Sequence, residues 1–314
     1  MVDLRGKRVA LALGGGGARG CAHMGAIAEL ESRGAEIVAV AGTSMGAIIG
    51  GVYAAGKLEP YSDWLQGLTY RDVIRMLDPA LRSPGFINAE KIMLRVREVI
   101  GDTLIEDLRI PFTAIATELL TGKEVWFQNG PLEHAIRASI AIPSIITPLV
   151  ERGRVYVDGG LVDLVPVMPL ASARADLIVA VSVIGNPFVA EPSRSVPAEE
   201  LLVETPDGST DSRDQDIVAR IRSRLGWDVP EATELPALET HESHAMNLRT
   251  LDVMELSIQT MQRTITRYQL ASFPPDIYIE LPTDICGTME FHRAREVADR
   301  GRARTAAVLD AMAG

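Results

Sequence analysis

Apolar residues near the start of the chain fall into two short continuous runs, each followed by a segment with helical spacing. Residues 8–13 and 37–41 are apolar with little alternation, as expected of parallel strands that are buried on both faces. The first run precedes a predicted helix over 21–32 that stops at Gly34, and the second precedes a predicted helix over 45–55. Two strand–turn–helix units in succession predict βαβ connections and a parallel sheet.

The rest of the chain continues this α/β pattern. Further strands are predicted in "PFTAIATEL" and "KEVWFQNG", which flank a turn at Thr121-Gly122, and at 154–157, 176–184 and 276–281. Helices are predicted from the N-cap Asn88 to just before Gly101, around 131–141 and around 289–312. These elements predict an α/β fold with a mainly parallel central sheet.

One window, residues 37–56, is uncharged and about long enough to cross a bilayer. Its Gly-Thr-Ser break favours a strand, a tight turn and a small-residue helix over a membrane span. The start "MVDLRGKRVALAL" lacks the apolar core and cleavage site of a signal peptide. The two cysteines, Cys21 and Cys286, have no spacing typical of a disulfide framework or a zinc site. We therefore expect a cytoplasmic protein, with peripheral contact at the inner face of the membrane left open.

Acidic residues are concentrated in the stretch 191–244, which holds thirteen Asp and Glu against five Arg and so accounts for −8 of the chain's net charge of −11. This charge argues against a nucleic-acid partner. The composition predicts a mobile surface insertion. Its segment "DQDIVARIRSRLGW" has helical spacing and is either a helix packed on its own domain or a lid that touches lipid. We expect a single domain over 1–314, with a core of 7–190 and 245–314.

Four consecutive glycines, Gly14–Gly17, follow the first predicted strand. Such a loop leaves backbone N–H groups free to face an anion. A P-loop is excluded because Gly20 is followed by Cys21-Ala22 and not by Lys-Ser/Thr. The spacing Gly15-x-Gly17-x-x-Gly20 fits a dinucleotide fingerprint, but the second strand ends in "VAVAG", without the acidic residue that would bind the ribose.

The second predicted strand ends instead in Gly42-Thr43-Ser44-Met45-Gly46. This is the G-x-S-x-G pattern of a nucleophile elbow, between a strand and a helix as the motif requires. Gly42 and Gly46 suit the close backbone approach of such a turn. Because neighbouring parallel strands end at the same edge of a sheet, the glycine loop should lie beside Ser44. We therefore interpret the loop as an oxyanion hole for acyl chemistry at Ser44.

A nucleophilic serine needs a base. None of the histidines lies in a late strand-end loop, and His23, inside the first predicted helix, is expected to be packed or solvated; the five are His23, His134, His241, His244 and His292. The histidines in "ETHESH" (239–244) are a weak metal-binding candidate, and no metal is expected. Asp158 follows a short strand and precedes Gly159-Gly160. Asp158 either forms an ordinary Asx turn or acts as a base. Burial could raise the pKa of such a base from about 3.9.

The order and approximate spacing of four motifs resemble those of the patatin-like phospholipases: "GGGGARG", "GTSMG", "IRASIAIPSIITP" and "DGG". The C-terminal "DICGTMEFHRAREVADRG" also resembles bacterial members. The resemblance covers roughly residues 7–188 and 250–312. It implies a three-layer α/β/α sandwich and a Ser–Asp dyad without histidine. One departure is Pro143-Ser144, where many members have Pro-Gly.

Carried over by position, the resemblance implies that Ser44 is the nucleophile and Asp158 the base. The N–H groups of Gly16 and Gly17 would form the oxyanion hole, with Arg19 close by. The implied activity is hydrolysis of acyl lipids, of phospholipase A or lysophospholipase type, without metal or nucleotide. Acyl transfer, a thioester substrate and non-catalytic binding of an acyl lipid stay open. The head group, the chain length and the oligomeric state are not predicted.

Overall fold

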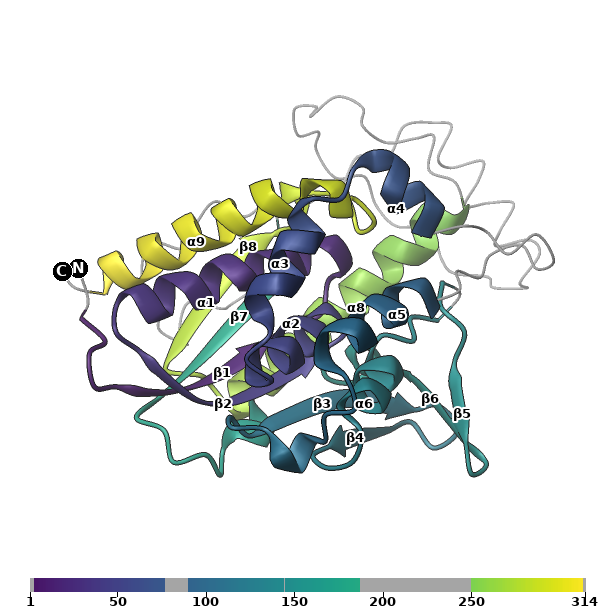
Figure 1. Ribbon diagram of the computed structural model, residues 1–314, viewed down its shortest axis with the longest axis horizontal. Helices are drawn as coiled ribbons and strands as arrows, with labels where there is room; N and C mark the ends of the chain where they lie inside the picture. The colour runs from purple at the N-terminus through teal and green to yellow at the C-terminus, as the bar shows by residue number, and fades with distance from the viewer. Residues whose placement is uncertain (1–2, 77–89, 144, 187–249, 313–314) are drawn as a thin grey trace, which may run out of the picture. The chain divides into compact units, whose positions relative to one another are not determined.

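The computed structural model describes residues 3–76, 90–143, 145–186 and 250–312 (Figure 1). The chain divides into two units, one made of Met1–Val189 and Met254–Gly314 and the other of Ala190–Val253. Several sequence predictions lie outside the described residues: the acidic insertion 191–244, its amphipathic segment and "ETHESH", together with the N-cap Asn88 and the departure at Ser144.

One eight-stranded sheet forms the centre of the first unit, in the order β5-β6-β3-β2-β1-β7-β8, with β4 paired to β3 outside this path. The parallel pairs join β1 (Arg8–Leu13), β2 (Glu36–Thr43), β3 (Phe112–Glu118), β7 (Leu177–Gly185) and β8 (Ile277–Pro282). The antiparallel pairs bring in β4 (Lys123–Phe127), β5 (Leu149–Glu151) and β6 (Arg154–Asp158). The sheet is therefore mainly parallel, as predicted.

Alternate residues of β1 face two different cores. Val9, Leu11 and Leu13 belong to the larger core, which is shared with α1 (Ala22–Ser32), α2 (Met45–Ala54), α6 (Leu132–Ser139) and α9 (Ala294–Ala311). Ala10 and Ala12 belong to a second core on the other face, against which Leu270 of α8 (Thr250–Ser272) packs. Helices thus cover both faces of the sheet (Figure 1), which confirms the α/β/α architecture.

The small residues of β1 and β2 explain why other elements pack closely against the second face of the sheet. Ala39 and Ala41 join Ala10 and Ala12 in a layer of alanines against the segment 165–170 and α8. Short side chains let the backbone of the covering elements approach the sheet closely, at the packing density of protein interiors. This close approach brings α8 next to the loop that follows Asp158.

The predicted strand–turn–helix over 37–56 is confirmed as β2 and α2. In the described part of the chain, no helix is both long and apolar enough to cross a membrane. The C-terminal helix begins at Ala294, after the 3-10 turn Phe291–Arg293, and not near residue 289. The pattern did not predict four further elements: β5, α8, α3 (Leu58–Gln66) and α4 (Tyr70–Met76). The helix predicted to end before Gly101 is α5 (Glu90–Ile100).

Candidate active site

Ser44 lies at the sharp turn between β2 and α2, with φ 56° and ψ −121°. A non-glycine residue rarely adopts such a conformation, and it persists only where the surroundings impose it. A Cβ on Gly42 would lie 2.3 Å from the Gly46 carbonyl oxygen, and a Cβ on Gly46 would lie 2.0 Å from the Leu13 carbonyl oxygen. Both positions of the motif are therefore restricted to glycine by backbone contacts.

Two hydrogen bonds hold this turn in place. The Ser44 N–H donates to the Ser139 hydroxyl at the end of α6, over 2.9 Å. The Thr43 hydroxyl donates to the Asp163 carbonyl oxygen, also over 2.9 Å. All of these side chains are buried. The turn is thus anchored to two segments that are distant in sequence, and neither anchor was predicted.

Asp158 is the last residue of β6, and its two carboxylate oxygens have different surroundings. Oδ1 accepts the Gly160 N–H over 2.7 Å, which forms the Asx turn that was one of the two interpretations of this residue. Oδ2 is buried and makes no hydrogen bond of normal geometry with the described residues, although the Ser44 side chain lies close enough to lower the pKa of Asp158. Such contacts are often long before substrate binds. The turn therefore leaves one oxygen available toward Ser44.

Burial raises the pKa of Asp158 to about 6, and the contacts with Ser44 and the Gly160 N–H oppose this shift. A carboxyl with this pKa is a stronger base than an exposed aspartate, and it is still mostly ionised at neutral pH. Gly159, the next residue, is restricted to glycine because its Cβ would lie 2.4 Å from the Ile115 carbonyl oxygen.

Strand β3 brings Ser44 and Asp158 to the same level of the sheet. Thr43, just before the nucleophile, is paired with Ile115 of β3 in the parallel ladder. Asp158 is paired with Ala116, the next residue of β3, in the antiparallel ladder. Two adjacent residues of one strand therefore determine the position of both candidate catalytic residues.

The glycine loop lies beside Ser44, as the parallel-sheet argument predicted. Leu13 of β1 is paired with Gly42 of β2. A Cβ on Gly15 would lie 3.2 Å from the Ser44 Cβ. A Cβ on Gly20 would lie 2.5 Å from the Met45 side chain. The loop and the turn that carries the serine thus pack directly on each other.

Two adjacent N–H groups of the loop have no acceptor among the described residues, those of Gly16 and Gly17. The N–H groups on either side are used, because Gly15 donates to the Leu164 carbonyl oxygen over 3.0 Å and Ala18 donates to the Thr288 carbonyl oxygen over 2.8 Å. Gly17 has φ 59°, and its Cβ would lie 2.4 Å from that same Thr288 oxygen. These two free donors are the groups predicted for the oxyanion hole.

Arg19 is buried, and its described hydrogen bonds brace the loop. Its guanidinium donates to the carbonyl oxygens of Gly16 over 3.2 Å and of Thr283 over 3.4 Å, and to the Thr288 hydroxyl over 3.3 Å. Direct contact of Arg19 with a developing oxyanion stays a prediction. The bond to the Gly16 carbonyl links Arg19 to the peptide whose N–H belongs to Gly17.

The histidines that the structure describes make no described contact with Ser44 or Asp158. His23 is fully buried in α1, where its Nε2 lies 2.7 Å from the Gly14 carbonyl oxygen. His134 faces Glu151 at 3.2 Å, and the ring of His292 lies edge-on to Tyr70. His241 and His244 lie outside the described residues. Within the described ranges, no group of three or more His, Cys, Asp and Glu could hold a metal ion.

A narrow apolar pocket of about 50 Å³ opens beside Ser44. Most of its lining is aliphatic or aromatic and comes from α2, α3, α5, the segment after α6 and the turn before α9: Met45, Ile48, Tyr61, Trp64, Leu65, Ile92, Ile140, Ile142, Ile146 and Phe291, together with Gly17 and Ser44. The contribution of α3 was not predicted, because that helix was not. The lining suits a hydrocarbon chain attached to the carbon that Ser44 would attack.

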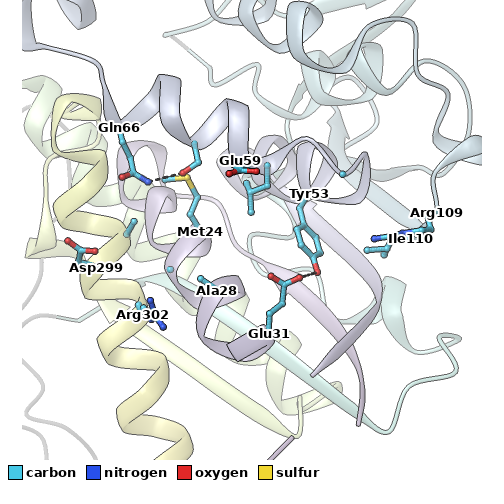
Figure 2. Close-up of a pocket in the computed structure, with 15 residues that line it drawn as sticks. Met24, Ala28, Glu31, Tyr53, Glu59, Gln66, Arg109, Ile110, Asp299 and Arg302 are labelled. Atoms are coloured by element: carbon cyan, nitrogen blue, oxygen red, sulfur yellow. Dashed lines mark hydrogen bonds between the residues drawn. The ribbon is translucent and has the colours of Figure 1, made fainter. Parts of the chain in front are cut away.

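A larger groove of about 440 Å³ lies among α1, α3 and α9 (Figure 2). Its walls are mixed in charge, with Glu31, Glu59 and Asp299 near Arg109 and Arg302, and the Tyr53 hydroxyl donates to Glu31 over 2.6 Å. Neither Ser44 nor Asp158 lines it. We therefore place the candidate chemistry in the smaller pocket.

A model of the patatin-like phospholipase family matches residues 11–171, which include the glycine loop, Ser44 and Asp158. The chain belongs to this family. An uncharacterised NTE family protein of Mycobacterium bovis is 42% identical over 97% of this chain and 92% of its own length. Its counterpart in Mycobacterium tuberculosis matches to the same extent. The resemblance inferred from the four motifs is thereby confirmed.

Two further similarities have lower sequence identity. Lysophospholipase NTE1 of Mycosarcoma maydis is 34% identical over 57% of this chain, which is 10% of its own length. Among solved structures, VipD from Legionella pneumophila aligns with a TM-score of 0.43 and 14% identity, covering 97% of this chain and 66% of VipD. At that level the alignment supports no further conclusion.

Proposed function

We propose that this protein is a serine lipid acyl hydrolase of phospholipase A or lysophospholipase type, with Ser44 as nucleophile and Asp158 as base. The observation that carries the proposal is that Asp158, whose buried Oδ2 has no hydrogen-bond partner among the described residues, lies close enough to the Ser44 side chain for that contact to lower its pKa. Membership of the patatin-like phospholipase family and the lysophospholipase relatives support the lipid-hydrolase class.

In the proposed acylation step, the Ser44 Oγ attacks the ester carbonyl carbon while Asp158 Oδ2 takes the hydroxyl proton. The carbonyl oxygen becomes negatively charged, and the N–H groups of Gly16 and Gly17 donate to it. Such preformed donors stabilise charge that exists only in the transition state and intermediate. Collapse of the intermediate breaks the bond to the alcohol or lysolipid, which leaves with the proton from Asp158.

Deacylation repeats these roles with water. Asp158 Oδ2 takes a proton from a water molecule as its oxygen attacks the acyl carbon, and the same two N–H groups hold the oxyanion. When the intermediate collapses, the Ser44 oxygen leaves and regains its proton from Asp158. The products are a free fatty acid and the original enzyme. Every proton is thus moved by one carboxyl group.

The apolar pocket supports an acyl chain as the substrate group nearest to Ser44. Burying each methylene contributes about 0.8 kcal/mol to binding, so a chain of several carbons would bind without polar contacts. A volume of about 50 Å³ holds only the beginning of such a chain. A longer chain would therefore require side chains of the lining, such as Ile142 and Phe291, to move apart.

Labelling with a fluorophosphonate probe tests whether Ser44 is activated. Wild-type protein should be labelled, Ser44→Ala should not, and Ser62→Ala, a serine in the larger groove, should behave as wild type. Folded wild-type protein that resists labelling and releases no fatty acid from lysophospholipid would contradict the proposal and favour non-catalytic binding of an acyl lipid.

Analysis of products separates the remaining alternatives. Free fatty acid released from phospholipid or lysophospholipid vesicles indicates hydrolysis. Appearance of the acyl group on an added alcohol or thiol indicates transfer. Co-sedimentation of the protein with the same vesicles tests the predicted contact with the membrane surface, and repeating it at high salt tests repulsion between the acidic chain and anionic lipid.

A further inference from the structure

His23 is a buried histidine for which the proposed reaction has no use. It lies one residue after the start of α1, is fully buried, and places its Nε2 2.7 Å from the Gly14 carbonyl oxygen. A carbonyl oxygen only accepts, so Nε2 carries the proton and donates it. Nδ1 is buried and has no partner among the described residues, so a second proton there would lack an acceptor. Burial accordingly lowers the pKa of His23 to about 4, and the ring is neutral at physiological pH.

The hydrogen bond from His23 fixes one end of the peptide unit that begins the glycine loop. The other end of this unit, the Gly15 N–H, donates to the Leu164 carbonyl oxygen over 3.0 Å. Just before it, the Gly14 N–H donates to the Val181 carbonyl oxygen over 2.9 Å. In the described structure, the Gly14–Gly15 peptide is thus held by one backbone group, the Leu164 carbonyl, and by one side chain, that of His23.

The next two peptide N–H groups, of Gly16 and Gly17, are those without acceptors. Glycine residues impose little torsional preference of their own, so hydrogen bonds must hold these N–H groups in position. The peptide of the Gly17 N–H is held by Arg19 through the Gly16 carbonyl, and the Gly16 N–H follows directly on the Gly14–Gly15 peptide that His23 holds. Backbone acceptors on β7 and on the loop after Asp158 hold the N–H groups of Gly14 and Gly15, whereas the carbonyl groups are held by side chains: that of Gly14 by His23 and that of Gly16 by Arg19. Loss of the His23 donor leaves the Gly14–Gly15 peptide held by a hydrogen bond at its N–H end alone, so that its carbonyl end can shift.

We infer that His23 is a positioning residue for the oxyanion hole: its imidazole N–H orients the Gly14 carbonyl so that the Gly16 and Gly17 N–H groups point at the reacting carbonyl. The inference rests on the proposed function of the loop. His23 acts through the loop and makes no described contact with Ser44 or Asp158. It is therefore distinct from a catalytic histidine.

Replacing the imidazole by groups with and without a donor tests this role. His23→Leu removes the N–H, whereas His23→Gln keeps an amide N–H at a similar reach. His134→Gln, at a half-buried position of α6 beside Glu151, is the matched control and should retain wild-type activity. For hydrolysis of a short-chain ester, His23→Leu should lower kcat on the order of 10²-fold with KM little changed, as displacements near 1 Å in an active site do. His23→Gln should restore most of kcat, with the same pH profile as wild type.

The same set of variants distinguishes the ways in which the inference could fail. Equal activity of His23→Leu and wild type would overturn it while leaving the proposed function intact. Equal inactivity of folded His23→Leu and His23→Gln, with wild type active, would mark His23 as the base and overturn both. Wild type that neither reacts with the fluorophosphonate probe nor hydrolyses any ester would refute the proposed function itself. If His23→Leu does not fold, as judged by thermal melting, His23→Asn replaces it, because its shorter amide does not reach Gly14.

Discussion

The backbone N–H of Ser44 donates to the hydroxyl of Ser139 over 2.9 Å, and both residues are buried. Ser139 is the last residue of α6, so this bond connects the strained turn at Ser44 to a helix on the same face of the sheet. A buried N–H without an acceptor is costly, and the Ser139 hydroxyl supplies that acceptor. The conformation of Ser44 therefore depends on a side chain from a distant part of the sequence.

Ser139→Ala should weaken both stability and activity. It leaves the Ser44 N–H buried without a partner, which typically costs about 1–3 kcal/mol of the free energy of unfolding. We expect kcat to fall roughly 10-fold or more, because displacements near 1 Å already cost about 10²-fold. Urea unfolding and ester hydrolysis measure the two effects. Ser32→Ala, which removes a hydroxyl at the end of α1, is the control, and equal behaviour of the two variants would argue against the role of Ser139.

Ser44 and Asp158 should behave as one unit in mutant kinetics. Ser44→Ala, Asp158→Asn and the double variant should all fall to a similar low kcat, because removal of either member abolishes the same step. Single-turnover and steady-state hydrolysis of a nitrophenyl ester measure this. Asp299→Asn, an exposed aspartate on α9, should retain activity. A double variant much slower than both single variants would show that the two residues act independently.

The pH dependence of kcat/KM should follow the ionisation of Asp158. The base must be deprotonated, and burial raises its pKa to about 6. Activity should therefore rise with pH through about 6 and level off above about 7, until another group titrates. A profile measured from pH 4.5 to 8.5 on a neutral substrate checks this. Activity that is constant across that range would contradict Asp158 as the base.

Asp158→Asn should also make the folded protein more stable at neutral pH. The pKa of Asp158 is raised from 3.8 to about 6 in the fold, so between about pH 4 and 6 the folded state binds more protons than the unfolded state. Its contribution to the free energy of unfolding then falls as pH rises through this window, by up to about 3 kcal/mol. Asparagine does not titrate, so the variant has no such loss. Its free energy of unfolding should therefore rise relative to that of wild type as the pH rises to about 6, and the difference should persist at higher pH. Denaturant unfolding of both proteins at pH 4, 6 and 8 measures the difference between their free energies of unfolding. A difference that is equal at all three pH values would contradict the pKa shift.

Gly17→Ala should affect kcat far more than KM. The added Cβ would meet the Thr288 carbonyl oxygen at 2.4 Å, and the residue has φ 59°, so the loop must move. Loss of one oxyanion donor typically lowers kcat by about 10²–10³-fold. Gly67→Ala is the control, because Gly67 has φ −84° and its Cβ would come no closer than 3.3 Å to its neighbours. Binding of NAD or FAD by the wild-type protein would instead favour the dinucleotide interpretation of the loop.

The strands and the turn at Ser44 could be predicted because their determinants are local. The continuous apolar runs at 8–13 and 37–41 specify buried parallel strands, and parallel pairing brings their ends together without further information. The family resemblance and the α/β/α architecture are confirmed, whereas the roles of Ser44, Asp158, Gly16 and Gly17 stay predictions that their geometry supports.

The anchoring side chains could not be predicted, because their function is set by contacts across the fold. Ser139 lies in an ordinary helical pattern, and nothing in its neighbourhood reveals that the Ser44 N–H needs an acceptor. His23 was expected to be packed or solvated, and periodicity does not show that its ring meets the Gly14 carbonyl. Helix α3, which contributes Tyr61, Trp64 and Leu65 to the pocket, begins with a proline-containing polar segment, and its apolar face is short.

The two candidate catalytic residues belong to parts of the sheet that differ in their resistance to local unfolding. Ser44 follows β2, which is enclosed by strands on both sides, whereas Asp158 ends β6, which is next to the short outermost strand β5. Regions near a sheet edge open at lower free energy than the centre does. Gentle heating or dilute denaturant should therefore displace Asp158 while Ser44 keeps its native surroundings. Inactivation would then precede the cooperative melting of the molecule and recover quickly on cooling.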